Sequence, residues 1–283
     1  MLPGAGLCAH RGLNAAVLGT TVRPSMGADD RRAPHRMAVA ANGDAARRGA
    51  SGGSTIAFSV LLAAAAAAII GTLHFVAYVV PTEASMGIVQ KIFYFHAPAG
   101  YAMYLGATAC FIGSAGYLAR GTQWWDSLAK SGAQVAVAMG LIVLITGPLW
   151  AAKAWGVYWT WDPRLTTSLL SVLIYVAYVV LRAFTGDSDA ERKFAAALGV
   201  LGAANLPIIH YSVKMWGGNH PTVITGKGGG LGHPDMKLAL GFGFLAFTLL
   251  SLALLWARLR VDLASARLAE LEQEALEVGI GED

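Results

Sequence analysis

The stretch WGVYWTWD, residues 155–162, places three tryptophans and one aspartate close together in a chain that holds eight tryptophans among 283 residues. Two roles suit such a cluster. Tryptophan gathers at membrane–water interfaces, where the indole anchors a protein among the lipid head groups. Indole rings also offer broad apolar faces against which a flat ligand can pack. The first role needs no other special residues, whereas the second needs ligand-binding groups nearby.

Histidines supply such groups at the ends of apolar segments elsewhere in the chain. They occur in KIFYFHAPAGY, NLPIIHYSV, MWGGNHPT and GLGHPDM, and are His96, His210, His220 and His233. The membrane topology predicted from the charge distribution places all of them on the same side as the tryptophan cluster. Because neutral imidazole is a common metal ligand, the pattern predicts a metal or metal-cofactor site on that side.

Haem explains the two residue types together. Imidazoles ligate haem iron axially, and aromatic faces pack against the apolar macrocycle. Arg164, or Lys153 with Lys214, could neutralise the propionates. A zinc site is the competing use of the histidines. A zinc site, however, would not require the indoles that lie near these histidines, which are those of Trp150, Trp155, Trp159, Trp161 and Trp216.

Asp162 ends the cluster and is followed by Pro163 and a long apolar run. An aspartate in that place can accept hydrogen bonds from the N–H groups of a first helical turn, and proline is favoured at the first helical position. We therefore expect Asp162 to cap a helix, and we keep it as a cofactor-binding candidate with ligand contact as its less favoured role.

The elements that position these residues are apolar helices. The chain is 55% hydrophobic and 13% charged, with a mean hydropathy of +0.53, whereas soluble domains carry about a quarter charged residues. A helix needs about 20 apolar residues to cross a bilayer. Six runs approach that length: 54–80, 92–119, 131–152, 165–184, 194–213 and 237–257. We predict an all-α integral membrane protein, a bundle of six transmembrane helices with a tryptophan-rich loop on its outer face.

The orientation follows from the positive charges near the span ends, because cytoplasmic loops carry an excess of Lys and Arg. One side has six of them: Lys91, Lys153, Arg164, Lys214, Lys227 and Lys237. The other side has ten: Arg47, Arg48, Arg120, Lys130, Arg182, Arg192, Lys193, Arg258, Arg260 and Arg267. We therefore predict that both termini are cytoplasmic and that the tryptophan-rich loop lies outside.

The two flanks differ from the membrane domain, 54–257. Residues 1–53 are rich in Gly, Ala and Arg without an apolar period. They are predicted to be a disordered basic cytoplasmic tail, with Met26 and Met37 as alternative start residues. Residues 258–283 begin RLRVDLASARLAELEQEALE, in which charges alternate with Leu and Ala at helical spacing. This pattern predicts a cytoplasmic amphipathic helix and tail.

Three blocks, in order, carry a resemblance to a known family: IFYFHAPAGY, WGVYWTWDPRLTTSLL and NLPIIHYSVKMWGGNHPT. The second block resembles the tryptophan-rich WWD signature of membrane haem-handling proteins. Together, across residues 60–257, the blocks look like the CcmC family, the haem-handling (haem exporter) proteins of cytochrome c maturation. The tail and the C-terminal helix fall outside the resemblance.

The resemblance implies a non-covalent haem b held on the outer face of a prokaryotic inner membrane between two axial histidines. Carried over by motif, these ligands are His96 and His220. The family's usual Trp-Trp followed by Leu-His reads MWGGNH in this chain. His210 therefore stays a rival for the second ligand, and Met215 a weaker one.

The resemblance further implies that the protein presents haem to a periplasmic-type haem chaperone (CcmE-like) and works with ABC transporter subunits (CcmA- and CcmB-like). No catalysis by the chain itself and no nucleic-acid partner are expected. The alternatives are a haem lyase of the related WWD type and a haem transport or export subunit. Lyases of that type are generally larger, with additional spans and histidines. A transmembrane electron carrier would place histidine pairs near both membrane faces, whereas these histidines lie on one.

Overall fold

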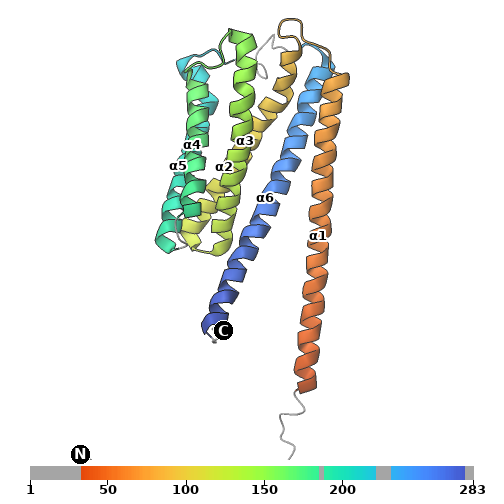
Figure 1. The fold of residues 1–283 in the computed structure, drawn as a ribbon, viewed down its shortest axis with the longest axis vertical. Helices are drawn as coiled ribbons and strands as arrows, with labels where there is room; N and C mark the ends of the chain where they lie inside the picture. The colour runs from red at the N-terminus through yellow and green to blue at the C-terminus, as the bar shows by residue number, and fades with distance from the viewer. Residues whose placement is uncertain (1–32, 185–187, 221–230, 278–283) are drawn as a thin grey trace, which may run out of the picture. The chain divides into compact units, whose positions relative to one another are not determined.

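The computed structural model describes residues 33–184, 188–220 and 231–277, with side chains from residue 54 onward. The chain divides into two compact units, 1–53 and 54–283, and the candidate site lies in the second. Figure 1 shows the helices, which are α1 (Ala33–Tyr78), the short 3-10 helix η1 (Ile88–Ile92), α2 (Phe93–Arg120), α3 (Gln123–Trp155), α4 (Pro163–Phe184), α5 (Asp189–Trp216) and α6 (Pro234–Glu277).

Each of the six α-helices contains a stretch long and apolar enough to cross a membrane, and the described residues form no strand. The predicted all-α fold with six spans is therefore confirmed. Two helices run further than expected. The backbone of α1 is helical from Ala33, where a disordered tail up to residue 53 was predicted; alanine, the best helix former, recurs in that stretch. The predicted C-terminal helix is a direct continuation of α6 up to Glu277. Residues 1–32 and 278–283 of the predicted tails lie outside the described residues.

Helices α2 and α3 form a hairpin whose two backbones touch. The turn between them begins at Gly121, which has a positive φ of 64°, a conformation that glycine adopts without strain. A Cβ atom on Gly106 would lie 2.5 Å from the backbone nitrogen of Ala136, and one on Gly113 would lie 2.4 Å from that of Ala129. Only glycine fits at these positions, so small residues determine how closely the two membrane helices approach.

Helices α4 and α5 form a second pair, joined by hydrogen bonds inside the bundle. The side-chain amide of Asn205 donates to the carbonyl oxygen of Thr167 at 2.8 Å and to the Ser171 hydroxyl at 2.7 Å. Helix α5 begins with a capping box, in which Ser188 accepts from the N–H of Glu191 while the Glu191 carboxylate accepts from the Ser188 N–H. The start of α5 is thereby ordered by local interactions.

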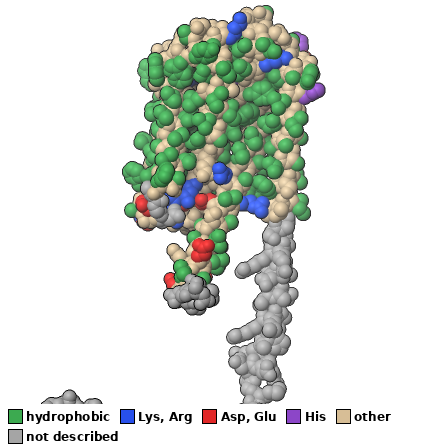
Figure 2. All heavy atoms as spheres, viewed as in Figure 1, with side chains coloured by type: hydrophobic (Ala, Val, Ile, Leu, Met, Phe, Trp, Pro, Cys, Tyr) green, Lys and Arg blue, Asp and Glu red, His purple; other side chains and the backbone are tan. Residues whose placement is uncertain are grey.

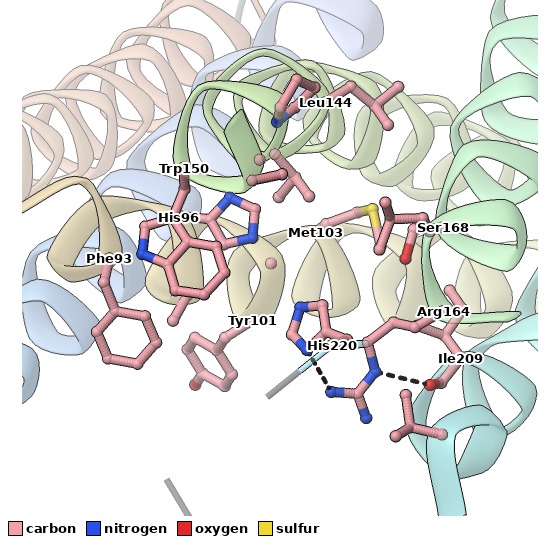
Figure 3. A pocket seen from close by; sticks show the side chains of 18 of the residues that line it. Phe93, His96, Tyr101, Met103, Leu144, Trp150, Arg164, Ser168, Ile209 and His220 are labelled. Atoms are coloured by element: carbon pink, nitrogen blue, oxygen red, sulfur yellow. Dashed lines mark hydrogen bonds between the residues drawn. The ribbon is translucent and has the colours of Figure 1, made fainter. Parts of the chain in front are cut away.

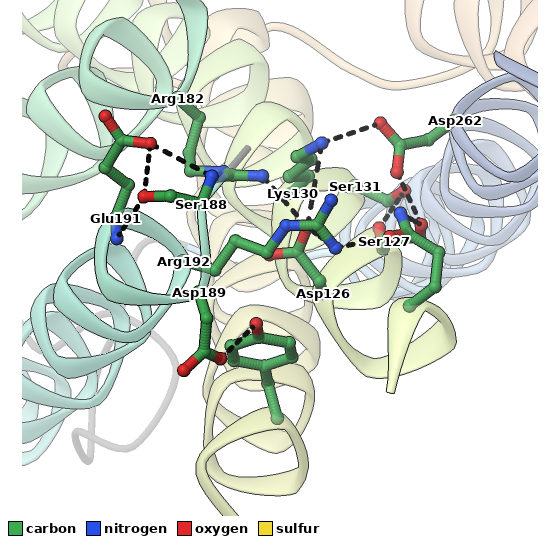
Figure 4. Close-up of polar contacts among 12 residues, drawn as sticks. Asp126, Ser127, Lys130, Ser131, Arg182, Ser188, Asp189, Glu191, Arg192 and Asp262 are labelled. Atoms are coloured by element: carbon green, nitrogen blue, oxygen red, sulfur yellow. Dashed lines mark hydrogen bonds and ion pairs between the residues drawn. The ribbon is translucent and has the colours of Figure 1, made fainter. Parts of the chain in front are cut away.

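An ion-pair network joins α3, α4, α5 and α6 at one end of the bundle (Figure 4). Asp126, only 2% exposed, accepts from Arg182 at 2.9 Å and lies 3.7 Å from Lys130 and 3.9 Å from Arg192. Lys130 also contacts Asp262 of α6 at 3.3 Å. Because one carboxylate faces several cations, the network stabilises the packing of four helices rather than one pair.

The opposite ends of the same helices carry the candidate site. The network lies at the start of α3 and the end of α4, whereas the tryptophan-rich stretch joins the end of α3 to the start of α4. Figure 2 shows a broad hydrophobic surface between the two ends, with the acidic and many of the basic side chains gathered at the lower one. Helix α1 contacts α6 through ring pairs, Phe58 with Trp256 and Phe75 with Phe242.

Candidate functional site

A cavity of about 490 Å³ opens among α2, α3, α4, α5 and α6 at the tryptophan-rich end of the bundle. Its walls are mainly apolar and aromatic, and Figure 3 shows imidazole and guanidinium groups at its side. A volume of this order suits a small-molecule cofactor. Of the residues that the sequence singled out, eight line it: His96, Trp150, Trp155, Trp159, Arg164, His210, Lys214 and His220.

His96 enters the cavity from the first turn of α2, directly after the 3-10 helix. Its Nδ1 atom lies 2.9 Å from the hydroxyl of Thr146 on α3. That hydroxyl donates in turn to the carbonyl oxygen of Ile142 at 2.6 Å. The next residue, Gly147, has no side chain where a Cβ atom would lie 3.2 Å from Cε1 of the imidazole. The α2–α3 hairpin therefore holds the ring from behind.

His220 reaches the same cavity from the segment after α5, and Asp162 holds that segment in place. One carboxylate oxygen of Asp162 accepts from the N–H groups of Asn219 and His220 at 3.0 and 3.2 Å. The other accepts from the N–H of Leu165 at 2.9 Å, in the first turn of α4. The predicted capping role of Asp162 is thus confirmed. Its second contact, which was not predicted, connects the tryptophan-rich loop to the histidine segment.

Arg164 lies between α4, α5 and the histidine segment. Its guanidinium donates to the carbonyl oxygens of Ile209 and His210 at 3.4 and 3.0 Å. A third nitrogen lies 3.2 Å from Nδ1 of His220. Since a guanidinium has no acceptor, Nδ1 of His220 accepts this hydrogen bond. A permanent positive charge is therefore fixed at the cavity wall beside His220.

The indoles divide into two groups. Trp150, Trp155 and Trp159 line the cavity, and the first two meet edge to face at 5.9 Å between ring centroids. Trp161 packs edge to face on Trp159 at 5.8 Å, but it is 76% exposed and does not line the cavity. Trp216 is likewise outside the lining and 59% exposed. The predicted tryptophan wall is thus built by the first group, with the second group on the surface near it.

The remaining candidates lie in different places. His210 lines the cavity beside Lys214, and its ring packs against Tyr211 at 4.8 Å. His233 is paired with Asp235 at 3.4 Å and does not line the cavity. Neither Met215 nor Lys153 lines it. The structure therefore brings together His96, His210 and His220, and leaves the fourth histidine apart.

The sequence did not predict most residues of the inner wall. Those that it missed include Phe93, Tyr101, Met103, Tyr104, Val143 and Leu144. These side chains belong to membrane helices in which cavity-facing and lipid-facing positions are equally apolar. The only indication of this wall in the sequence was the group of aromatic residues around His96, in FYFHAPAGYAMY.

These residues fit a haem. Two imidazoles from separate elements face one apolar cavity, as axial ligation of a flat macrocycle requires. Arg164 and Lys214 supply cations that can pair with propionates. The buried Nε1–H of Trp159 has no hydrogen-bond partner among the described residues, which leaves a donor for a bound group. Over the same described residues, no group of three His, Cys, Asp or Glu side chains is arranged to hold a metal ion.

Comparison with known proteins identifies the family of the chain. The family model described as heme exporter protein C, CcmC, matches residues 46–274. The heme exporter protein C of Bradyrhizobium diazoefficiens is 32% identical over 193 residues, which cover 68% of this chain and 73% of the relative. That of Paracoccus denitrificans is 30% identical over 220 residues, covering 75% and 88%. A ccmC-like mitochondrial protein of cytochrome c biosynthesis from Marchantia polymorpha is 29% identical over 175 residues, covering 62% and 74%. The chain therefore belongs to the heme exporter protein C (CcmC) family, as a multi-pass membrane protein that handles haem during c-type cytochrome maturation.

Proposed function

We propose that the protein holds a non-covalent haem b in the aromatic cavity, with His96 and His220 as the axial ligands of the iron. The observation that carries this proposal is the convergence of the two imidazoles, from the start of α2 and from the segment after α5, on one apolar cavity. When bound, the haem supplies an iron with two axial positions. The chain supplies the imidazoles, the aromatic wall and the exclusion of water.

His220 is preferred to His210 as the second ligand because its backbone is held by Asp162 next to the tryptophan loop. His210 contributes its carbonyl oxygen to Arg164, and its ring packs against Tyr211. Arg164 and Lys214 are the groups proposed to bind the propionates. Arg164 already carries its charge at the wall beside His220, so haem with ionised propionates would be held at that side.

We further propose that the haem is passed to a CcmE-like haem chaperone at the exposed aromatic rim. The rim consists of Tyr158, Trp161 and Trp216, which are 66%, 76% and 59% exposed and lie at the cavity end of the bundle. Exposed aromatic residues in one region suit recognition of a protein partner. CcmA- and CcmB-like subunits of an ABC transporter are the other proposed partners. In this proposal the chain binds and presents haem and catalyses no bond formation itself.

The proposed location is a prokaryotic inner membrane, with both termini in the cytoplasm and the haem cavity on the outer face. It is supported by the excess of Lys and Arg at the end that carries the Asp126 network. A Tyr158→Cys variant in a background without the native Cys8 and Cys110 would be labelled from outside intact cells by a membrane-impermeant maleimide. A Thr122→Cys variant in the same background would be labelled only after lysis. The reverse pattern would overturn the orientation.

The ligand assignment is tested by visible absorption of the protein purified in detergent from haem-replete cells. The wild type is expected to show a Soret band with the sharp α and β bands of low-spin, two-histidine haem in the reduced state. His96→Ala and His220→Ala should each lose the low-spin bands, while His210→Ala should keep them. If His210→Ala loses the bands and His220→Ala keeps them, the second ligand is His210. Wild type without a Soret band would defeat the proposal as a whole.

Delivery is tested separately, with haem-loaded protein and a purified CcmE-like chaperone. Trp161→Ala should keep the absorption bands of the wild type, because its ring lies outside the cavity lining, and should transfer haem more slowly. Val157→Ala is a suitable control, since Val157 is also exposed and lies in the same loop but has no ring. Equal transfer by Trp161→Ala and the wild type would refute a role for the rim.

A further inference from the structure

The hydroxyl of Thr146 makes two short contacts, and together they determine where its hydrogen lies. It is 2.6 Å from the carbonyl oxygen of Ile142 and 2.9 Å from Nδ1 of His96. A carbonyl oxygen can only accept, and a threonine hydroxyl has one hydrogen. If that hydrogen pointed at His96, two oxygen acceptors would face each other at 2.6 Å without a hydrogen between them. The hydroxyl therefore donates to Ile142, and Nδ1 of His96 donates to the hydroxyl.

This direction fixes the tautomer of His96. A neutral imidazole carries its single N–H on one ring nitrogen, so an N–H at Nδ1 leaves the lone pair at Nε2. Gly147 leaves room for the ring in this orientation, because a Cβ atom at that position would lie 3.2 Å from Cε1. Thr146 itself is held by its bond to the residue one turn earlier, a common conformation of threonine in helices. The lone pair at Nε2 is thus prepared before a ligand arrives.

The second histidine of the cavity is held in a different way. Nδ1 of His220 accepts from Arg164 instead of donating, so a neutral His220 carries its N–H on Nε2. The Arg164 contact must therefore be released before this imidazole can offer a lone pair to iron. Thr146 does not line the cavity, which means that it acts on a ligand only through His96. The two imidazoles therefore differ in tautomer before haem binds, and of the two only His96 already has a free lone pair at Nε2.

We propose that Thr146 is a positioning residue for haem, which holds His96 with Nε2 directed at the iron and makes that imidazole a stronger electron donor. The inference rests on the proposed role of His96 as an axial ligand. A hydrogen-bond acceptor at the distal N–H raises the basicity of a ligating imidazole, and loss of such a partner typically lowers metal affinity about 10–100-fold. A more basic ligand stabilises ferric over ferrous iron, so Thr146 lowers the reduction potential of the bound haem.

Thr146→Val tests this role, since valine keeps the shape of threonine and removes the acceptor. The reduction potential of the bound haem should rise and haem affinity should fall by about 10-fold or more, while Thr146→Ser should restore both. Thr72→Val is the matched control. Thr72 on α1 makes the same kind of bond to the carbonyl oxygen one turn earlier, that of Ala68 at 2.7 Å, and does not line the cavity. It should change neither quantity.

The tautomer can be measured without haem, by nitrogen-15 NMR of histidine-labelled apoprotein in detergent. The His96 signals, assigned by comparison with His96→Ala, should show a protonated Nδ1 and an unprotonated Nε2 in the wild type. The opposite tautomer overturns the inference whether or not Thr146→Val folds. An unchanged potential in Thr146→Val, with the wild-type spectrum intact, would overturn it while leaving the haem-binding function in place. A wild type that binds no haem would overturn the proposed function and the inference with it.

Discussion

Asp162→Asn is the substitution that most directly tests how the cavity is built. The two oxygens of Asp162 serve two groups, the first turn of α4 and the N–H groups of residues 219 and 220. Asparagine has one acceptor oxygen, so one of the groups must lose its partner. The α4 cap can be kept if the amide nitrogen turns toward the histidine segment, where it meets two donors that it cannot accept from. The backbone of His220 is then no longer held beside the tryptophan loop.

The size of the effect follows from the two hydrogen bonds that the substitution removes. A hydrogen bond to a charged group contributes about 1.5–3 kcal/mol net. Removal of both bonds, at 3.0 and 3.2 Å, would cost about 3 kcal/mol at the lower end of that range. Each 1.4 kcal/mol changes an equilibrium constant about 10-fold. If the segment must be ordered for His220 to bind iron, the haem dissociation constant should rise about 100-fold. Haem titration of the apoprotein, followed at the Soret band, measures it.

Ser188→Ala is the control for Asp162→Asn. It also removes a helix cap, worth about 1 kcal/mol of stability, but at the start of α5, away from the cavity. The control should lower the unfolding temperature and leave the haem dissociation constant unchanged. The reasoning would be refuted by wild-type affinity in Asp162→Asn, or by equal decreases of affinity in both variants.

Further variants test the helix packing and the charges. Gly132→Val should lower the unfolding temperature in detergent, because a Cβ atom there would lie 2.3 Å from the backbone nitrogen of Cys110 on α2, whereas Gly71→Ala has open space and should not. Arg182→Met should destabilise the protein, but by less than the about 3–5 kcal/mol of a buried ion pair that loses its only partner, because Lys130 and Arg192 stay near Asp126; denaturation of the variant and the wild type decides this. Lys214→Ala should raise the haem dissociation constant without changing the positions of the low-spin bands, and a shift of those bands would show that iron ligation had changed instead.

Those parts of the fold that depend on local sequence were predictable. The six spans are apolar runs of bilayer length, and their number and approximate limits agree with the helices. The cap at Asp162 was predictable because the Asp-Pro pair at the start of an apolar run is a local signal. The membrane span of α6 was expected to end where charges begin, near Arg258, but a charged surface does not interrupt a helix that leaves the membrane.

The parts of the site that depend on distant contacts were less predictable. Trp155 and Trp159 line the cavity as expected, while the neighbouring Trp161 points to the surface, a difference that a loop sequence does not reveal. The second contact of Asp162 reaches a residue 57 positions later in the chain. Thr146 is a single hydroxyl-bearing residue in an apolar span. From the sequence alone, its hydroxyl could simply bond to a carbonyl oxygen of its own helix, and nothing indicates the contact with His96. Only the three-dimensional structure shows which of these side chains face the cavity and which contact residues far away in the chain.

The backbone contact between α2 and α3 has a consequence for hydrogen exchange. Because the two helices meet without intervening side chains at Gly106 and Gly113, neither can open unless both separate. We expect the amides of this hairpin to be among the last to exchange with deuterium. The amides of Asn219 and His220, which share one oxygen of Asp162, should exchange early. His96 belongs to a helix of this hairpin, whereas His220 belongs to a segment held through Asp162, and haem leaving the cavity is expected to part first from His220.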